Sequence, residues 1–480
     1  MSATDDAVPS SPAAALSQPT EAMPSGLSAI SPPIPLSARL LAKPFIDRLC
    51  LWGFRWLLPA SHAWATAALV DGDVDRFVAI LGRGRSSRAL EKKLLRTAEL
   101  RRIANAAFAA WHEAGFEDGK ATSPERLAEI ELVRRKTAQA FSSQRTSFMA
   151  FAKWHRLPAV PYQIPAPDAA VATLPSGQAA VSALFAVPTE MPAVAVSHRS
   201  VVRGVAEYWL RFTNPAKTGA TDDEPDTVWV HVYEPLNATG NTPSLIWAHG
   251  LSMELEMMEA GPLDFLSLAR SGIRILMPDG PGHNRRVRPG FYGGEAFLRA
   301  APISGLNHFR QTAGEFATLI DWCRTAGSAR VALGGISLGA LSAQVATNYM
   351  SDWPANCRPD TLLLLTTTDQ VSALITDSAL GQVADVDRAV LAAGWRAPHV
   401  AALARITDAP AEAPIDPARI VMLLGLRDNV TPYAGGLRLA RQWRLPTANI
   451  FTRDQGHFSA AFGLAIDPAP YRRIIEILKD

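Results

Sequence analysis

The second part of the sequence alternates between short apolar runs and segments of helical length, and this alternation constrains the fold most. Apolar runs of strand length follow residue 196 at 228–235, 244–250, 273–280, 330–337, 361–368, 419–428 and 448–457. Near-continuous apolar strands are typical of a mainly parallel sheet that is buried on both faces. The sequence therefore predicts an α/β fold with helices on both sides of the sheet.

The chain divides into four parts by composition. Residues 1–37 are rich in Ser, Pro and Ala without a hydrophobic period, and we expect a disordered tail there. Residues 38–156 are rich in helix-forming residues and predict a mostly helical N-terminal region. Residues 157–195 are rich in proline and predict a linker or a segment wrapped on the surface, so that residues 196–480 form the α/β domain.

The composition argues against several classes of protein. The net charge is +2 over 480 residues, which disfavours a dedicated nucleic-acid binder. The three cysteines lie far apart, and no cluster of histidines has metal-ligand spacing, so we expect neither a disulfide framework nor a metal or other cofactor. The chain begins with an acidic stretch and has no long uninterrupted apolar run, so we expect a cytoplasmic protein.

The segment after Pro44 predicts an amphipathic helix from Phe45 to Leu58 with a very wide apolar face. We expect this face to pack on the α/β domain. The alternative is that residues 38–70 contact a membrane surface, because Trp52 and Arg55 are of the types that interfacial helices use.

The strongest signal for chemistry is the sequence Gly-Ile-Ser-Leu-Gly at 335–339. A serine on a sharp turn between a strand and a helix needs small neighbours, because backbone atoms approach closely there. An apolar run precedes Ser337 and a segment of helical composition follows it. This context predicts an exposed nucleophile on Ser337.

A serine nucleophile needs a base, and the base needs a carboxylate to orient it. His457 and Asp428 each follow a predicted strand, and the order Ser337, Asp428, His457 is one of the known orders of such triads. Parallel strands bring their carboxyl ends to one edge of the sheet, so the three side chains are expected to meet. Asp369, after the run at 361–368, is the alternative acid.

A tetrahedral intermediate also needs backbone N–H donors near the nucleophile. Leu338, directly after Ser337, supplies one candidate donor, and Leu251 in the sequence His-Gly-Leu supplies the other. His249 is a weaker alternative for the base, because His457 fits the chain order better.

Residues 196–480 resemble the α/β-hydrolase superfamily. The matching pieces, in order, are HGL at 249–251, DGPGH at 279–283, GISLG at 335–339, GLRDNVTP at 425–432 and QGH at 455–457. The resemblance implies Ser337 as nucleophile, Asp428 as acid, His457 as base, and Leu251 and Leu338 as oxyanion donors. It identifies no subfamily, and residues 1–195 match no part of the superfamily core.

We therefore expect a serine hydrolase of the carboxylesterase or lipase type, acting on a small-molecule or lipid ester. Three alternatives remain at this point. The same residues could transfer an acyl group, they could cleave a peptide, thioester or lactone, or the chain could be an inactive scaffold. The interval between Asp369 and Pro414 is either a cap over the substrate or a plain helical connection.

Overall fold

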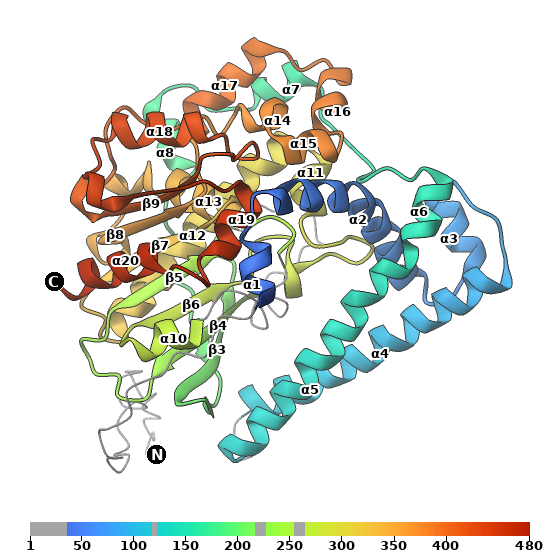
Figure 1. Ribbon diagram of the computed structural model, residues 1–480, viewed down its shortest axis with the longest axis horizontal. Helices are drawn as coiled ribbons and strands as arrows, with labels where there is room; N and C mark the ends of the chain where they lie inside the picture. Colours follow the sequence, from blue (N-terminus) through green and yellow to red (C-terminus); the bar gives the residue numbers. More distant parts are fainter. Residues whose placement is uncertain (1–35, 118–121, 217–226, 254–264) are drawn as a thin grey trace, which may run out of the picture.

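The computed structural model describes residues 36–117, 122–216, 227–253 and 265–480, and it confirms the α/β prediction (Figure 1). The centre is a ten-stranded sheet in the order β1-β3-β4-β6-β5-β7-β8-β9-β10, with β2 paired to β3. The strands are β1 (Ala195–Val196), β2 (Ser200–Val202), β3 (Val205–Thr213), β4 (Thr227–Pro235), β5 (Ser244–Ala248), β6 (Arg274–Pro278), β7 (Val331–Ile336), β8 (Thr361–Leu365), β9 (Ile420–Gly425) and β10 (Ile450–Arg453).

The sheet is parallel from β6 to β10 and antiparallel from β1 to the β4–β6 pair. Alternate residues of the central strands belong to two different buried clusters: Ile246 faces one side of the sheet, and Leu245 and Trp247 face the other. Both faces are therefore covered, which explains why these strands are continuously apolar in sequence.

Helices from the second part of the chain cover the two faces. On one face lie α12 (Ile303–Thr325) and α13 (Leu338–Thr347), and on the other lie α10 (Phe265–Arg270) and α20 (Ala469–Lys479). The remaining helices of this part are α11 (Glu295–Arg299), α14 (Leu374–Asp377), α15 (Ala379–Val383), α16 (Val386–Ala392), α17 (Ala397–Thr407), α18 (Tyr433–Gln442) and α19 (His457–Gly463).

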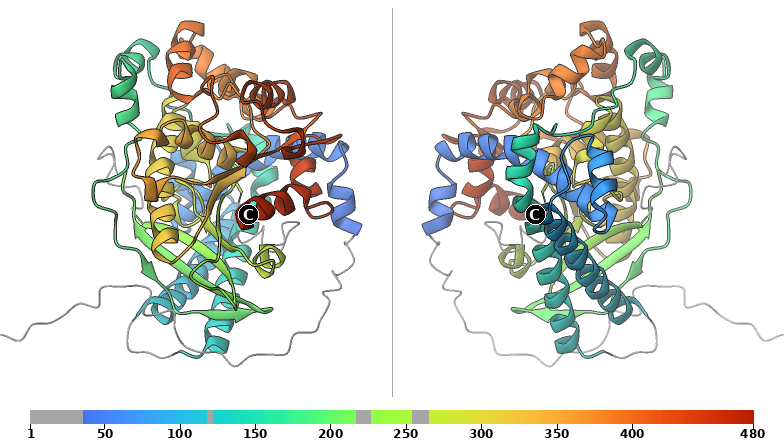
Figure 2. Two further views of the ribbon diagram at one scale, coloured as in Figure 1. Left: turned by 90° about the vertical axis from the view of Figure 1, so that its left-hand side faces the viewer. Right: turned by 90° about the vertical axis from the view of Figure 1, so that its right-hand side faces the viewer.

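The N-terminal region is helical, as predicted. Its helices are α1 (Leu36–Leu41), α2 (Phe45–Val70), α3 (Val74–Leu81), α4 (Arg88–Phe116), α5 (Pro124–Ser143) and α6 (Met149–His155). Helices α4 and α5 lie side by side as a long pair (Figures 1 and 2). Residues 1–35 of the predicted tail lie outside the described residues, and its last two residues belong to α1.

The predicted end of the first long helix at Leu58 is wrong, because α2 continues through Pro59 to Val70. A proline inside a helix removes one backbone hydrogen bond and costs about 3 kcal/mol. The turns after Pro59 are buried, including Ala60, Ala63 and Ala67, which are fully enclosed. Their burial in the same cluster as the sheet residues stabilises the continued helix.

The stretch from Phe45 to Leu58 packs on the α/β domain only in part: the ring of Phe54 lies 5.5 Å from that of Phe458, while other apolar side chains of the stretch are exposed. Phe45, Leu49 and Trp52 are each more than half exposed, whereas Trp64 is buried. Contact of residues 38–70 with a membrane surface stays a prediction. Within the described ranges, no helix combines the length and the apolar character that crossing a bilayer requires.

The proline-rich segment 157–195 lies against the α/β domain and contains two short helices, α7 (Pro167–Ala172) and α8 (Gln178–Ala183). The indole N–H of Trp395 donates to the carbonyl of Pro165, and the indole N–H of Trp353 donates to the carbonyl of Phe185, each at 2.9 Å. These bonds connect the segment to loop residues of the α/β domain more than 160 residues further along the chain.

Strand β3 was not among the predicted strands. Its sequence, VAEYWLRFT, carries Glu207 and Arg211, which interrupt the apolar run. Glu207 is nevertheless buried, because His231 of β4 lies 2.6 Å from its carboxylate and Arg135 of α5 pairs with it. Glu131 joins this cluster through Arg134 and Arg135, so arginines neutralise both carboxylates. The charge of Glu207 interrupts the apolar pattern by which a strand is predicted, and its ion pair with Arg135 connects α5 to the sheet.

Candidate active site

Ser337 lies on the turn between β7 and α13, at the carboxyl edge of the sheet. Its backbone has φ 54° and ψ −122°, a conformation that non-glycine residues rarely adopt. A Cβ atom at Gly335 or at Gly339 would overlap the carbonyl oxygen of Ala248 on the neighbouring strand. The two glycines are therefore required by close backbone approach, as the sequence pattern predicted.

His457 links Ser337 to Asp428. Its Nε2 lies 2.8 Å from Ser337 Oγ, and its Nδ1 lies 2.8 Å from Asp428 Oδ2. The carboxylate can only accept, so the proton of the neutral imidazole lies on Nδ1 and Nε2 is free to accept from the serine hydroxyl. His457 and Asp428 are buried, at 5% and 7% exposure, while Ser337 is partly exposed.

Asp428 is held by the turn that follows it. The backbone N–H groups of Val430 and Thr431 donate to Oδ1 at 2.8 and 2.9 Å, and the Thr431 hydroxyl donates to Oδ2 at 2.9 Å. Thr431 Oγ1 also lies 3.2 Å from His457 Nδ1. Sequence reasoning missed Thr431; the available signal was that an aspartate side chain often accepts from backbone N–H groups a few residues further on.

Asp369, the alternative acid, is paired elsewhere. Its carboxylate accepts from Arg438 Nε at 2.8 Å and from Nη2 at 3.0 Å. The structure thus brings Asp428, and not Asp369, into contact with His457.

The two residues predicted as oxyanion donors flank Ser337. Leu338 is the first residue of α13, where backbone N–H groups have no carbonyl partner within the helix. Leu251 and Ser337 line the same cavity. Gly250 lies so close that a Cβ atom there would be 3.3 Å from Ser337 Cβ. Both residues therefore lie close to Ser337, and their role as oxyanion donors stays a prediction.

Two buried histidines hold the loop that carries Leu251. His249 accepts from the Gly280 N–H at 3.0 Å and lies 2.9 Å from the Gly250 carbonyl oxygen through its other nitrogen. His283 accepts from the Ser252 N–H at 3.1 Å. Burial lowers the pKa of His249 and lowers that of His283 well below its usual value, so both rings are neutral. Because both nitrogens of His249 are occupied, it is not placed to act as the base.

An apolar cavity of about 130 Å³ opens beside Ser337. Its walls come from the loop at Leu251, from α11, α12 and α13, and from α14 to α17. The interval between Asp369 and Pro414 therefore forms part of the cavity wall. The Ser337 hydroxyl, hydrogen-bonded to an oriented imidazole, can attack a carbonyl carbon. The adjoining cavity can hold an apolar group that is attached to that carbon.

No protein-family model matches the sequence, and no curated protein matches it either. Among solved structures, the chain is similar to an acetyl xylan esterase from Paenibacillus sp. R4, with 16% identity, 67% of this chain and 96% of that chain covered, and a TM-score of 0.44. It is also similar to acetyl xylan esterase 1 from Thermoanaerobacterium sp. JW/SL YS485, with 15% identity, coverage of 63% and 95%, and a TM-score of 0.40.

A third similar structure is Est1E from Butyrivibrio proteoclasticus with bound ferulic acid, with 14% identity, coverage of 53% and 97%, and a TM-score of 0.34. These values are low, so the strand order and the placement of the three polar side chains are the basis for assigning the fold. Ser337 follows β7, Asp428 follows β9 and His457 follows β10. With this sheet order and these positions, the chain has the α/β-hydrolase fold.

Proposed function

We propose that the protein is a serine hydrolase that cleaves carboxylic esters through an acyl-enzyme on Ser337. The observation that carries the proposal is the continuous chain of hydrogen bonds from Ser337 through His457 to Asp428. The backbone strain at Ser337 adds support, because strain of this kind concentrates at functional sites.

In this mechanism, Ser337 Oγ attacks the ester carbonyl carbon while its proton passes to His457 Nε2. Asp428 stabilises the imidazolium, and the N–H groups of Leu251 and Leu338 stabilise the oxyanion. The tetrahedral intermediate then expels the alcohol, which takes the proton from Nε2, and leaves the acyl group on Ser337. A water molecule, deprotonated by His457, attacks the acyl-enzyme, and the acid leaves as Ser337 recovers its proton.

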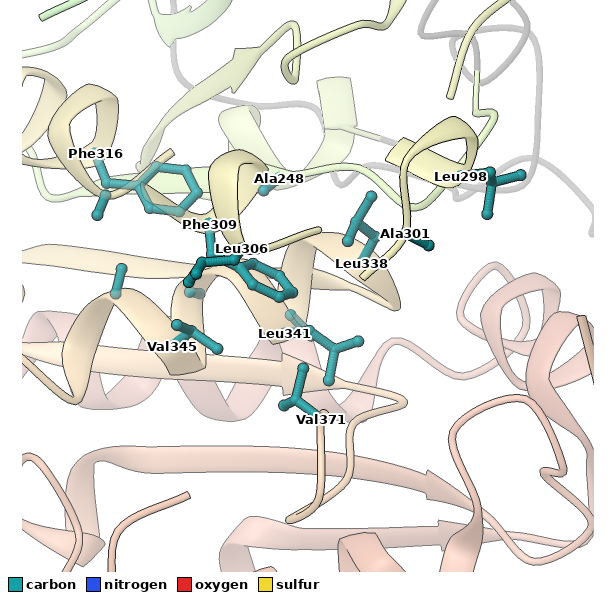
Figure 3. Packing of buried hydrophobic residues seen from close by; sticks show 14 of the residues in the cluster. Ala248, Leu298, Ala301, Leu306, Phe309, Phe316, Leu338, Leu341, Val345 and Val371 are labelled. Atoms are coloured by element: carbon teal, nitrogen blue, oxygen red, sulfur yellow. The ribbon is translucent and has the colours of Figure 1, made fainter. Parts of the chain in front are cut away.

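The cavity beside Ser337 supports an apolar acyl group of modest length as the substrate. Figure 3 shows Leu306, Phe309, Leu338, Leu341 and Val371, which also line the cavity. None of the described residues that line it is charged. An engineered apolar cavity of about 150 Å³ in another protein binds benzene, so a cavity of about 130 Å³ suits an acyl chain of about six carbons.

The first test concerns the nucleophile. We expect Ser337→Ala to lower the kcat for 4-nitrophenyl hexanoate by at least about 10³-fold, because loss of a nucleophile removes the acyl-enzyme route. A fluorophosphonate probe should label the wild type and leave the variant unlabelled. A variant that keeps more than about a tenth of wild-type turnover would contradict the proposal.

The second test concerns the acyl group. Among 4-nitrophenyl esters, we expect kcat/KM to be highest near the hexanoyl ester and at least about tenfold lower for the dodecanoyl ester, because the longer chain exceeds the cavity. The acetyl ester should also be poorer, since it leaves apolar wall unburied. A profile that rises continuously toward long chains would contradict this assignment of the cavity.

A further inference from the structure

A buried carboxylate from the N-terminal helical region reaches residues 455–459, which run from Gln455 and Gly456 into the first turn of α19 and form the His457 loop. Asp47, in the first turn of α2, is only 7% exposed. Its Oδ1 accepts from the backbone N–H groups of Phe458 at 2.7 Å and Ser459 at 3.3 Å, and its Oδ2 accepts from the Ser459 hydroxyl. The two sides of this contact are more than 400 residues apart in the chain.

The same loop is shaped to receive that carboxylate. A Cβ atom on Gly456 would overlap the carboxyl group of Asp47, and the three atoms nearest to it all belong to that group. The φ of Gly456 is −94°, which any residue can adopt, so the glycine serves the close approach and not the backbone conformation. Beside it, the Gln455 side-chain amide donates to the carbonyl of Ala42.

An aromatic contact completes the attachment. The rings of Phe54 in α2 and Phe458 lie 5.5 Å apart, and the ring of Phe458 stands against the imidazole of His457 at 5.3 Å and 85°. The segment α1–α2 thus contacts the residues on both sides of His457 through hydrogen bonds and ring packing.

We infer that Asp47 is a positioning residue that holds the His457 loop in register with Ser337, which makes the N-terminal helices part of the active-site architecture. The inference rests on the proposed function, in which His457 moves protons in both halves of the reaction. Nε2 must stay within hydrogen-bond distance of Ser337 Oγ throughout. A misplacement of about 1 Å at such a group can cost about 100-fold in rate.

The test compares Asp47→Ala, Asp47→Asn and the control Trp353→Phe by kcat per active site, with sites counted by fluorophosphonate titration. We expect Asp47→Ala to lower kcat per site by about 10- to 100-fold, with KM changed less than about threefold. Asp47→Asn keeps an acceptor oxygen for both backbone N–H groups and should retain kcat within about threefold.

Trp353→Phe removes the buried bond to Phe185, a different tie between the N-terminal part and the α/β domain. It should lower the Tm and leave kcat per site within about twofold. The titration separates the two claims: a wild type that neither turns over esters nor reacts with the probe refutes the proposed function. An active wild type whose kcat per site is unchanged in Asp47→Ala refutes only the positioning role.

Gly456→Ala disturbs the same contact through the residue that faces Asp47. It tests the inference even if Asp47→Ala does not fold. Its added methyl group must displace the loop from Asp47, so kcat per site should again fall about tenfold or more. In the double variant with Asp47→Ala the overlap is gone, and the two losses should be less than multiplicative. Multiplicative losses, or no loss from Gly456→Ala, would overturn the inference.

Discussion

The turn that carries Ser337 and the loop that carries His457 meet at one edge of the sheet, and the molecule holds them in different ways. The serine turn is held by backbone proximity, because Gly335 and Gly339 let it lie against the carbonyl of Ala248. The histidine loop is held by side chains, with Asp428 on the ring and Asp47 on the backbone that follows it.

The difference shows what each half of the candidate site depends on. The serine turn needs a short pattern of residue types that sits within five consecutive positions. The His457 loop needs partners from two segments that are distant in the sequence, Asp428 after β9 and Asp47 in α2. Changes at the first should act through local sterics, and changes at the second through hydrogen bonds and orientation.

The largest effect is expected where the histidine loses its acid. Asp428→Asn should lower kcat about 10⁴-fold, because an amide favours the wrong tautomer of His457. Asp369→Asn is the matched control and should stay within about threefold, since it breaks only an ion pair with the half-exposed Arg438. Steady-state kinetics of both variants checks this. Equal losses in kcat would contradict the assignment of Asp428 as the acid, and with it the view that a side-chain contact from Asp428 holds the His457 ring.

The second prediction tests whether close backbone packing at Gly339 holds the turn that carries Ser337. A methyl group there has no space against Ala248, so Gly339→Ala should lower the free energy of unfolding by about 3 kcal/mol or more and abolish labelling by the probe. Gly53→Ala in α2 is the matched control, because a Cβ atom at Gly53 meets no atom within 4 Å, and it should be neutral or slightly stabilising. Chemical denaturation measures both. A stable, labelled Gly339→Ala protein would refute the steric account.

The smallest effect concerns the loop at Leu251, which lies beside Ser337 and is held by buried histidines. His308 of α12 lies with its ring 6.3 Å from that of His283. Burial lowers the pKa of His308 to about 3 and that of His283 well below its usual value. Below about pH 6.5 the unfolded chain therefore binds protons that the folded chain does not bind, and the free energy of unfolding falls as the pH falls toward 3.

Each such histidine contributes a slope of up to about 1.4 kcal/mol per pH unit. Denaturation curves at pH 7.5, 6.5 and 5.5 should show this decline, and His308→Gln should make it shallower. The exposed His198 provides the control, because His198→Gln should leave the slope unchanged. A stability that is constant from pH 7.5 to 5.5 would contradict the assignment of neutral buried rings.

The sequence by itself determined the parts that depend on neighbouring residues. The central strands were predicted because they are buried on both faces and are continuously apolar. The turn at Ser337 and the positions of Asp428 and His457 after strands could be predicted for the same local reason. The choice between Asp428 and Asp369 could not, because both follow strands of one sheet, and only the folded chain shows Asp428 against His457 and Asp369 against Arg438.

Only the tertiary structure decided the remaining features. Strand β3 was missed because Glu207 is charged, and its partners come from α5 and β4. Helix α2 passes Pro59 because the turns beyond it are buried. In the sequence, Asp47 is one of the polar residues of an amphipathic helix, and only the folded structure shows that it accepts from the Phe458 N–H. In each case the stabilising partner is far away in the sequence. A local pattern shows that a charged residue or a proline is unfavourable in a strand or helix, but it does not show the distant contact that compensates for it.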